Sequence, residues 1–189
     1  MTIAISARRA VLATMLVTAP PVFAAVLTSS ESGFVSEASV DLPLSPVEAY
    51  ALVATPARWW NGAHSYSGDA KNLTIEAWAG GCFCEALPAV NGKPAGSVEH
   101  GRVLLAMPGD MLRISGGLGP LQGQAVVGTL TFSFAPSAAG MGKGTKVTMR
   151  YVVGGYVEGG AAKLAPAVDM VLGQQLQGLS RVAGMPMPR

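Results

Sequence analysis

The sequence predicts an α+β fold in which a curved antiparallel sheet of about seven strands packs against one long C-terminal helix. Two observations predict it. Between residues 34 and 156, segments of alternating apolar and polar residues are separated by short turns rich in glycine, proline and asparagine, and such connections join antiparallel neighbours. Between residues 163 and 183, apolar residues recur at every third or fourth position, as they do along one face of a helix.

The first elements are a strand and two short helices. Residues 34–44 alternate apolar and polar residues, which predicts a strand with one buried side. Ser45 then has the character of a helix N-cap, with Pro46 at the first helical position and Glu48 three residues after the cap. A second helical turn is expected over residues 55–60, before an Asn-Gly pair that ends it.

The remaining strands are expected at residues 73–78, 82–87, 98–107, 111–115, 125–134 and 146–153. The terminal helix is expected over residues 163–183. Its apolar stripe must face the sheet, and it consists of Leu164, Val168, Val171, Leu172, Leu176, Leu179 and Val182.

The N-terminus has the features of a secretory signal peptide over residues 1–24. Arg8 and Arg9 form a basic start, an apolar stretch of about ten residues follows, and Val22-Phe23-Ala24 ends the segment with a cleavage pattern. This stretch is shorter than the roughly 20 residues of a membrane span, so no retained anchor is expected. We expect cleavage after Ala24, a flexible leader at residues 25–33, a single domain at 34–185, a tail at 186–189 and a periplasmic or secreted location.

The composition fits one domain and gives no sign of a nucleic-acid partner. The 189 residues are 50% hydrophobic and 13% charged, the formal net charge is +2, and the basic residues are scattered. The glycine-rich segments lack the strand-loop-helix context and lysine-serine ending of a phosphate loop, and no serine hydrolase elbow or zinc protease motif is present. We therefore expect no cofactor and no metal, and the oligomeric state stays open.

Four motifs carry a resemblance to a known superfamily. They are residues 46–53 (PVEAYALV), 58–60 (RWW), 80–83 (GGCF) and 144–149 (GTKVTM). In this order and spacing, they resemble the START-like (SRPBCC) superfamily, especially the branch of heat-shock-protein ATPase activator homologues and polyketide cyclase-like proteins. The resemblance implies the helix-grip (Bet v-like) fold, with a cavity between sheet and helix. One such cavity serves lipid transport, polyketide binding, cyclisation, dehydration or co-chaperone contacts, so the fold alone does not fix the activity.

The leading functional hypothesis is the binding or transport of a small hydrophobic or amphipathic ligand. We expect Trp59 to anchor the second short helix in the core while Trp60 borders the cavity. The alternatives are an enzyme resembling a polyketide cyclase or dehydratase and a co-chaperone-like interaction module. The full set of expected ligand contacts is Trp59, Trp60, His64, Phe83, Glu85, Phe132, Met149, Tyr151, Leu164, Val168, Val171 and Leu172.

Three polar members of this set are the catalytic candidates of the enzyme hypothesis. Glu85 and Tyr151 lie on strand faces that alternation directs inward, and His64 lies in a loop near the expected cavity mouth. A carboxylate in an apolar site favours its neutral form and could act as an acid, while a tyrosine hydroxyl could orient the ligand. The alternative for Glu85 and Tyr151 is that each satisfies a buried backbone group.

The two cysteines and the second histidine are expected to be structural. Cys82 and Cys84 lie two residues apart on a strand, where Cα atoms are about 6.5–7 Å apart, at the limit for a disulfide. Two small buried side chains are therefore the favoured interpretation, with a redox pair or a soft-metal site as alternatives. His100 is expected to share a strand face with Val98, Arg102 and Leu104 and to be exposed or hydrogen-bonded.

Overall fold

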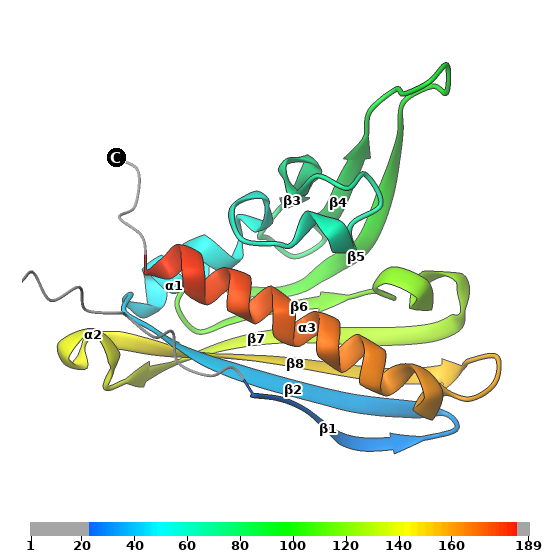
Figure 1. The fold of residues 1–189 in the computed structure, drawn as a ribbon. Coiled ribbons are helices and arrows are strands. Elements are labelled where there is room, and N and C mark those ends of the chain that lie inside the picture. The colour runs from blue at the N-terminus through cyan, green and yellow to red at the C-terminus, as the bar shows by residue number, and fades with distance from the viewer. Residues whose placement is uncertain (1–22, 185–189) are drawn as a thin grey trace, which may run out of the picture.

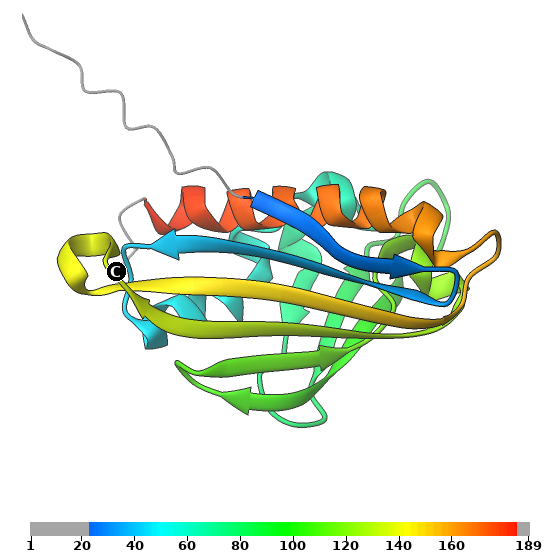
Figure 2. The same ribbon diagram turned by 90° about the horizontal axis from the view of Figure 1, so that it is seen from below.

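A computed structural model describes residues 23–184 of the chain. Eight antiparallel strands form one curved sheet in the order β1-β2-β8-β7-β6-β5-β4-β3, and a long helix, α3, crosses its inner face (Figures 1 and 2). The elements are β1 (Phe23–Ser30), β2 (Gly33–Leu42), α1 (Pro46–Val53), the 3₁₀ turns η1 (Pro56–Arg58), η2 (Gly62–His64) and η3 (Ala70–Asn72), β3 (Leu73–Ile75), β4 (Cys82–Leu87), β5 (Gly96–Met107), β6 (Met111–Ser115), η4 (Gly119–Gly123), β7 (Ala125–Ser137), α2 (Ala139–Gly142), β8 (Gly144–Tyr156) and α3 (Ala161–Ala183).

The expected fold class is confirmed. All strands expected from alternation are present, and α3 begins two residues before the expected start and ends at the expected residue. In Figure 1, the β3–β4–β5 side of the sheet curves round one flank of α3, while β2 and β8 run behind it. Among the helices between residues 23 and 184, none combines the length and the apolar character that a membrane span requires.

The expectation of a flexible leader at residues 25–33 is wrong, because these residues include most of β1. This strand pairs with β2 from Phe23 opposite Ser39 to Ser30 opposite Gly33. Its first five residues are apolar and its last three are polar, so the segment does not alternate, but backbone pairing requires no alternation. Residues 1–22 lie outside the described part, and a signal peptide over residues 1–24 with cleavage after Ala24 stays a prediction.

The start of α1 forms as the sequence predicts. The Glu48 carboxylate accepts a hydrogen bond from the Ser45 backbone N–H at 2.9 Å, and the Glu48 N–H donates to Ser45 Oγ at 3.4 Å. Hydrogen bonds from the Ser45 side chain and backbone lower the pKa of Glu48. The reciprocal bonds satisfy N–H groups that have no partner within the helix.

The core lies between α3 and the inner face of the sheet. Leu172, Leu176 and Leu179 of α3 are at most 3% exposed and belong to one apolar cluster with the buried residues of β7 and β8. Ser36 of β2 adds a polar tie by donating a hydrogen bond to Asp169 of α3 at 2.5 Å. At Gly178, an added Cβ would collide with the backbone oxygen of Trp59, so the glycine permits the close approach of α3 to the chain after η1.

A bulge turns His100 inward. Phe83 pairs with Gly101 but Cys84 pairs with Glu99, so His100 is an extra residue in β5. The consequence is that His100 is only 7% exposed, whereas Arg102 and Leu104 face outward. The expectation that His100 shares a face with Arg102 and Leu104 is therefore wrong, because the bulge shifts the alternation by one position.

Cys82 and Cys84 form a disulfide, contrary to the expectation of two unpaired cysteines. Their Cα atoms are 5.4 Å apart, within the usual range for a bridge and closer than regular extended geometry allows. The register shift between Phe83 and Cys84 lies within this short segment. The pairing of β4 with β5 is irregular at this point, and the short Cα separation permits the bridge.

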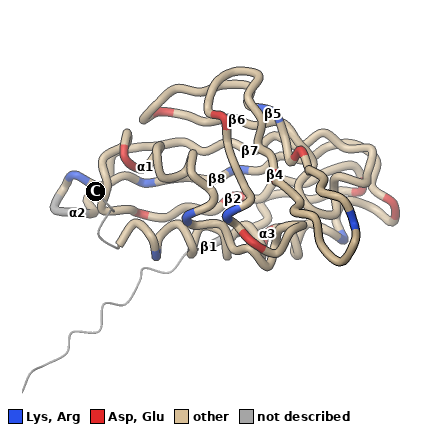
Figure 3. Tube along the Cα trace, turned by 90° about the horizontal axis from the view of Figure 1, so that it is seen from above, with Lys and Arg blue, Asp and Glu red and all other residues tan. Residues whose placement is uncertain are grey.

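Charged residues of both signs are interspersed along the trace, and no element carries a run of one sign (Figure 3). Their distribution over the fold is therefore as scattered as it is along the sequence. A field of one sign over a whole face would need such residues to cluster.

Candidate functional site

An apolar pocket of about 430 Å³ lies beside the N-terminal half of α3. One wall is a stripe of α3 at helical spacing, the second is the chain between residues 60 and 66, and the third is the segment that leads into η4. We call this space the apolar pocket. Its lining consists of Trp60, His64, Ser65, Tyr66, Leu118, Gly119, Pro120, Leu164, Ala167, Val168, Val171 and Leu172.

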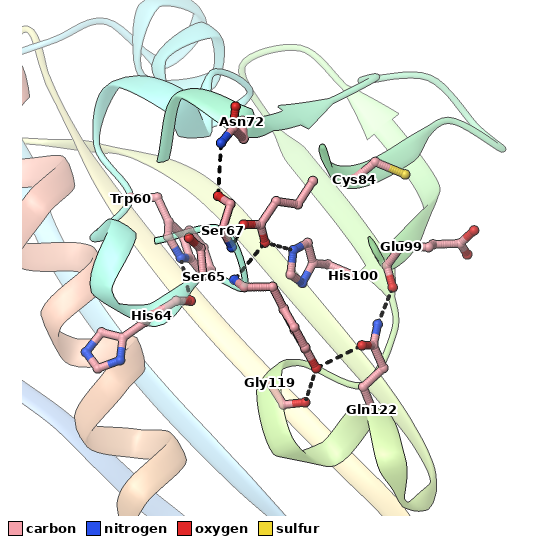
Figure 4. A network of polar contacts seen from close by, with 12 residues as sticks. Trp60, His64, Ser65, Ser67, Asn72, Cys84, Glu99, His100, Gly119 and Gln122 are labelled. Atoms are coloured by element: carbon pink, nitrogen blue, oxygen red, sulfur yellow. Dashed lines mark hydrogen bonds and ion pairs between the residues drawn. The ribbon is translucent and has the colours of Figure 1, made fainter. Parts of the chain in front are cut away.

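A buried carboxylate fixes the second wall. Glu85 of β4 is 1% exposed and accepts backbone hydrogen bonds from Tyr66 at 3.0 Å and from Ser67 at 2.5 Å. Its Oε2 also lies 2.9 Å from His100 Nε2, which the bulge in β5 directs at it (Figure 4). The side chain therefore holds the 65–67 loop against the sheet and does not line the apolar pocket.

The environment of Glu85 favours its charged form. Burial has the largest single influence and raises the pKa, but the hydrogen bonds from Ser67, Tyr66 and His100 together outweigh it. The resulting pKa is below the usual value for a glutamate. This is the opposite of the shift that a general acid needs near neutral pH.

A buried tyrosine fixes the third wall in the same manner. The Tyr151 hydroxyl donates to the carbonyl oxygen of Gly116 at 2.8 Å and accepts from the Leu118 N–H at 3.0 Å. Burial raises the pKa of Tyr151 to about 12, although the Leu118 bond acts in the other direction. At Gly128 an added Cβ would collide with the Tyr151 hydroxyl, so glycine there leaves room for this contact.

Tyr66 joins the two walls at the rim. Its hydroxyl lies 2.9 Å from Gln122 Oε1 and 3.2 Å from the carbonyl oxygen of Gly119, and Gln122 donates in turn to the Glu99 backbone oxygen (Figure 4). Tyr66 as a whole is 52% exposed, so this lining residue lies at the solvent side of the pocket.

Six of the expected ligand contacts line the apolar pocket and six do not. The first six are Trp60, His64, Leu164, Val168, Val171 and Leu172. The other six are at most 3% exposed and do not line it: Trp59, Phe83, Glu85, Phe132, Met149 and Tyr151.

Aromatic side chains fill the space between sheet and helix where the cavity was expected. Trp59 meets Phe132 edge-on with ring centroids 6.3 Å apart, and Trp60 meets Phe83 at 5.5 Å. The apolar pocket therefore lies on the flank of α3, away from the face of β7 and β8. Trp59 anchors the chain as expected, with its indole N–H donating to the Val53 carbonyl at 3.3 Å, and Trp60 borders the pocket.

Sequence reasoning missed several lining residues. Ala167 lies three residues after Leu164 and four before Val171, so helical spacing could have identified it. Tyr66 and the segment 118–120 come from loops, where no periodicity indicates which side chains face inward. The role of His100 depends on the bulge, which the sequence pattern does not reveal.

The pocket offers apolar surface with few polar groups. Of the three catalytic candidates, only His64 lines it, and His64 Nε2 lies 2.6 Å from Gln174 Oε1 of α3. Glu85 and Tyr151 instead satisfy backbone groups, which was the structural alternative for both. The arrangement is suited to hold an apolar group, with His64, Ser65 and loop backbone groups to orient it.

Comparisons with known proteins place the fold but not the activity. No family model matches the chain, and no curated protein matches its sequence. Solved structures do match. A protein from Rhodobacter sphaeroides aligns with a TM-score of 0.52 and 17% identity, over 84% of this chain and 96% of that one. The Mll3558 protein from Rhizobium loti aligns with a TM-score of 0.53 and 16% identity, over 85% and 98%.

CalU16 from Micromonospora echinospora aligns with a TM-score of 0.51 and 15% identity, over 82% of this chain and 78% of that one. The chain has the helix-grip fold. At these identities the likeness concerns the fold alone, because unrelated functions share such architectures.

Proposed function

We propose that this chain is a START-like (SRPBCC) protein that binds or carries a small hydrophobic or amphipathic ligand in the apolar pocket. The observation that carries the proposal is the pocket of about 430 Å³, which has the size of typical ligand sites. Leu164, Val168, Val171 and Leu172 give it an apolar floor on a rigid helix. The four sequence motifs and the helix-grip fold support the superfamily assignment.

Two of the loops that line the pocket are held in place by hydrogen bonds. This favours the interpretation of the pocket as a ligand site over that of a chance hollow in the surface. Glu85 and Tyr151 are buried polar groups, and each uses its hydrogen bonds to fix a loop that lines the pocket. A pocket with walls fixed in advance loses less conformational entropy when a ligand binds. The enzyme alternative would depend on His64 alone, since the other two candidates do not line the pocket.

We further propose that the chain acts in the periplasm or outside the cell. The signal-like residues 1–24 support this location. The Cys82–Cys84 disulfide also supports it, because disulfides persist in oxidising compartments. N-terminal sequencing of the exported protein should give Ala25 as the first residue, and a chain that retains Met1 in the cytoplasm would contradict the proposal.

The binding proposal is tested with a pocket-filling variant and a matched control on the same helix. Titration of the neutral apolar dye N-phenyl-1-naphthylamine should show saturable binding to the wild type. Ala167→Phe places a ring in the pocket and should weaken that binding by at least about ten-fold, which corresponds to the burial of a few methylene groups. Met170→Phe alters a residue of α3 that is 56% exposed and should leave it unchanged.

Native mass spectrometry of protein purified from its own host provides the second readout. A co-purified small molecule, lost in Ala167→Phe and kept in Met170→Phe, is the expected result. Equal dye binding by all three proteins, with no bound molecule in any of them, would overturn the proposal.

A further inference from the structure

The polar groups of the apolar pocket are hydrogen-bond donors and acceptors without formal charge. None of the described residues that line it is Asp, Glu, Lys or Arg, so neutral side chains and the loop backbone supply all of its polar groups. A donor or acceptor that already has a partner in the protein is not available to a ligand. The groups that are left over therefore indicate the chemistry of the ligand that the pocket can pair with.

The side-chain donors of the lining loops are already paired within the protein. The Trp60 indole N–H donates to the His64 carbonyl oxygen at 3.4 Å, and the Ser65 hydroxyl donates to the Gly62 carbonyl oxygen at 2.9 Å. The Tyr66 hydroxyl has a single proton and lies within hydrogen-bond distance of two oxygens of η4 (Figure 4). A ligand that needs a donor would have to displace one of these bonds.

The backbone donors of the same loops are used in a similar way. At residues 60 and 64–66, each N–H donates to a backbone oxygen or to the Glu85 carboxylate. The Leu118 N–H donates to a buried tyrosine hydroxyl, and Pro120 has no N–H. Among these lining residues, only Gly119, at the start of η4, has an N–H that bonds to no group in the described part of the chain. The pocket is therefore poor in available donors.

The imidazole of His64 supplies an available acceptor. Its Nε2 lies 2.6 Å from Gln174 Oε1, and an amide oxygen can only accept, so Nε2 carries the proton. In the neutral ring the other nitrogen, Nδ1, then has a lone pair. Within residues 23–184, no group donates to this nitrogen. Gln174 thus fixes the tautomer in which the ring offers an acceptor, because the bond at one ring nitrogen sets the role of the other.

An anionic ligand would meet a negative charge behind the loop wall. The Glu85 carboxylate is 3.0 Å from the backbone nitrogen of Tyr66, which lines the pocket, and hydrogen bonds hold the pKa of Glu85 below its usual value. Like charges repel, and a charge that is removed from water without a partner is strongly unfavourable. A cationic ligand would find no carboxylate among the described lining residues.

We propose that the apolar pocket selects an uncharged alcohol, and that His64 Nδ1 accepts the hydrogen bond from the hydroxyl group of this ligand. The apolar part of the ligand packs on the floor that α3 provides. This inference rests on the proposed binding function, and it adds the charge class of the ligand and the residue that recognises its polar group.

The test compares ligands that have the same number of non-hydrogen atoms and differ in the polar group. Dodecanol, methyl undecyl ether, undecanoate and dodecylammonium are each used, below micelle formation, to displace N-phenyl-1-naphthylamine from the full chain. The ether accepts a hydrogen bond but cannot donate one. The wild type should bind dodecanol about three- to ten-fold tighter than the ether, as expected for one neutral hydrogen bond, and should bind both ions more weakly than dodecanol.

Variants of His64 test its role through the ratio of the ether and dodecanol dissociation constants. His64→Phe keeps a ring but removes the acceptor, so the ratio should fall by about three- to ten-fold. His64→Asn keeps an acceptor, since its side-chain oxygen lies close to the position of Nδ1, and should retain most of the preference. The matched control is Met170→Phe, which alters a residue of α3 that is 56% exposed and should keep the wild-type ratio.

The outcomes distinguish this inference from the proposed function. Equal affinity of the wild type for dodecanol and the ether, or tighter binding of either ion than of dodecanol, would overturn the selection of an alcohol and leave the binding function intact. A preference for dodecanol that survives unchanged in His64→Phe would overturn the role of His64. Failure of the dye to bind, or of every ligand to displace it, would remove the proposed function itself.

Discussion

Replacing Glu85 with glutamine should destabilise the protein and loosen the wall of the apolar pocket. The carboxylate accepts from two backbone N–H groups, those of Tyr66 and Ser67, and from His100. Glutamine has nearly the same volume, so the change tests charge and acceptor number with little effect on packing. It keeps one acceptor oxygen and directs an N–H₂ group at a backbone donor.

The expected cost follows from these contacts. A buried donor without an acceptor costs about 1–3 kcal/mol, and the remaining hydrogen bonds weaken from about 1.5–3 to about 0.5–1.5 kcal/mol each once the charge is lost. Glutamine is neutral, so the variant no longer has the desolvation cost of a buried charge. This gain offsets part of the loss. We therefore expect a loss of about 2–4 kcal/mol, or a melting temperature lower by roughly 4–16 °C for a chain of this size.

The assay is thermal unfolding followed by near-ultraviolet circular dichroism, together with dye titration of the folded protein. Glu37→Gln is the control, because Glu37 pairs with Arg150 at 2.8 Å on the surface, where both side chains are at least about one-third exposed. Such pairs contribute at most about 1 kcal/mol. A Glu85→Gln protein that melts within a degree of the Glu37→Gln protein and binds dye equally well would refute the anchoring role.

The pH dependence gives an independent check on the same residue. The folded pKa of Glu85 is lowered, so its contribution to stability is present above the unfolded value near 4.3 and is lost as the pH falls through the folded pKa. The difference in stability between wild type and Glu85→Gln should therefore be constant near neutral pH and shrink below about pH 4. The lowered pKa of Glu48 is common to both proteins and cancels in the comparison.

Three further predictions concern other parts of the fold. Tyr151→Phe removes two hydrogen bonds to the 116–118 loop and should cost about 1–3 kcal/mol and weaken dye binding. Since the folded pKa of Tyr151 is raised to about 12, its contribution is present below pH 10 and is lost as the pH rises towards 12, so alkaline melting curves of the two proteins should converge there. Reduction of the Cys82–Cys84 bridge opens a three-residue loop and should cost about 1.5 kcal/mol in the loop-entropy model, measured as a fall in melting temperature with dithiothreitol; no fall would show that the bridge adds no stability. Ser45→Ala removes the cap of α1 and should cost about 1 kcal/mol by urea unfolding, whereas an unchanged midpoint would contradict the capping argument.

Some of the pocket residues could be predicted from alternation or helical spacing in the sequence, and others could not. The α3 stripe was identified because helical spacing depends only on residues close in sequence. Glu85 and Tyr151 were also correctly directed inward, but alternation does not say whether the inward face meets a ligand or another side chain. Here Glu85 meets the 65–67 loop, about twenty residues earlier in the chain.

The volumes of side chains from distant segments decided where the pocket lies. Trp59 and Phe132 are separated by more than seventy residues, yet their rings pack together and fill the place where a cavity was expected. No local pattern reports such a contact. The bulge at His100 is a second example, since it depends on how β5 pairs with β4.

The sequence by itself determined the order and type of the elements. Alternation and helical spacing are periods that each segment carries, and the Ser45 cap and its Glu48 partner are three residues apart, so these features require no knowledge of the rest of the chain. Only the tertiary structure decided that β1 joins the sheet, that Cys82 and Cys84 form a bridge, and that the apolar pocket lies on the flank of α3. Each of these depends on strand register or on the meeting of side chains far apart in sequence, which local patterns do not specify.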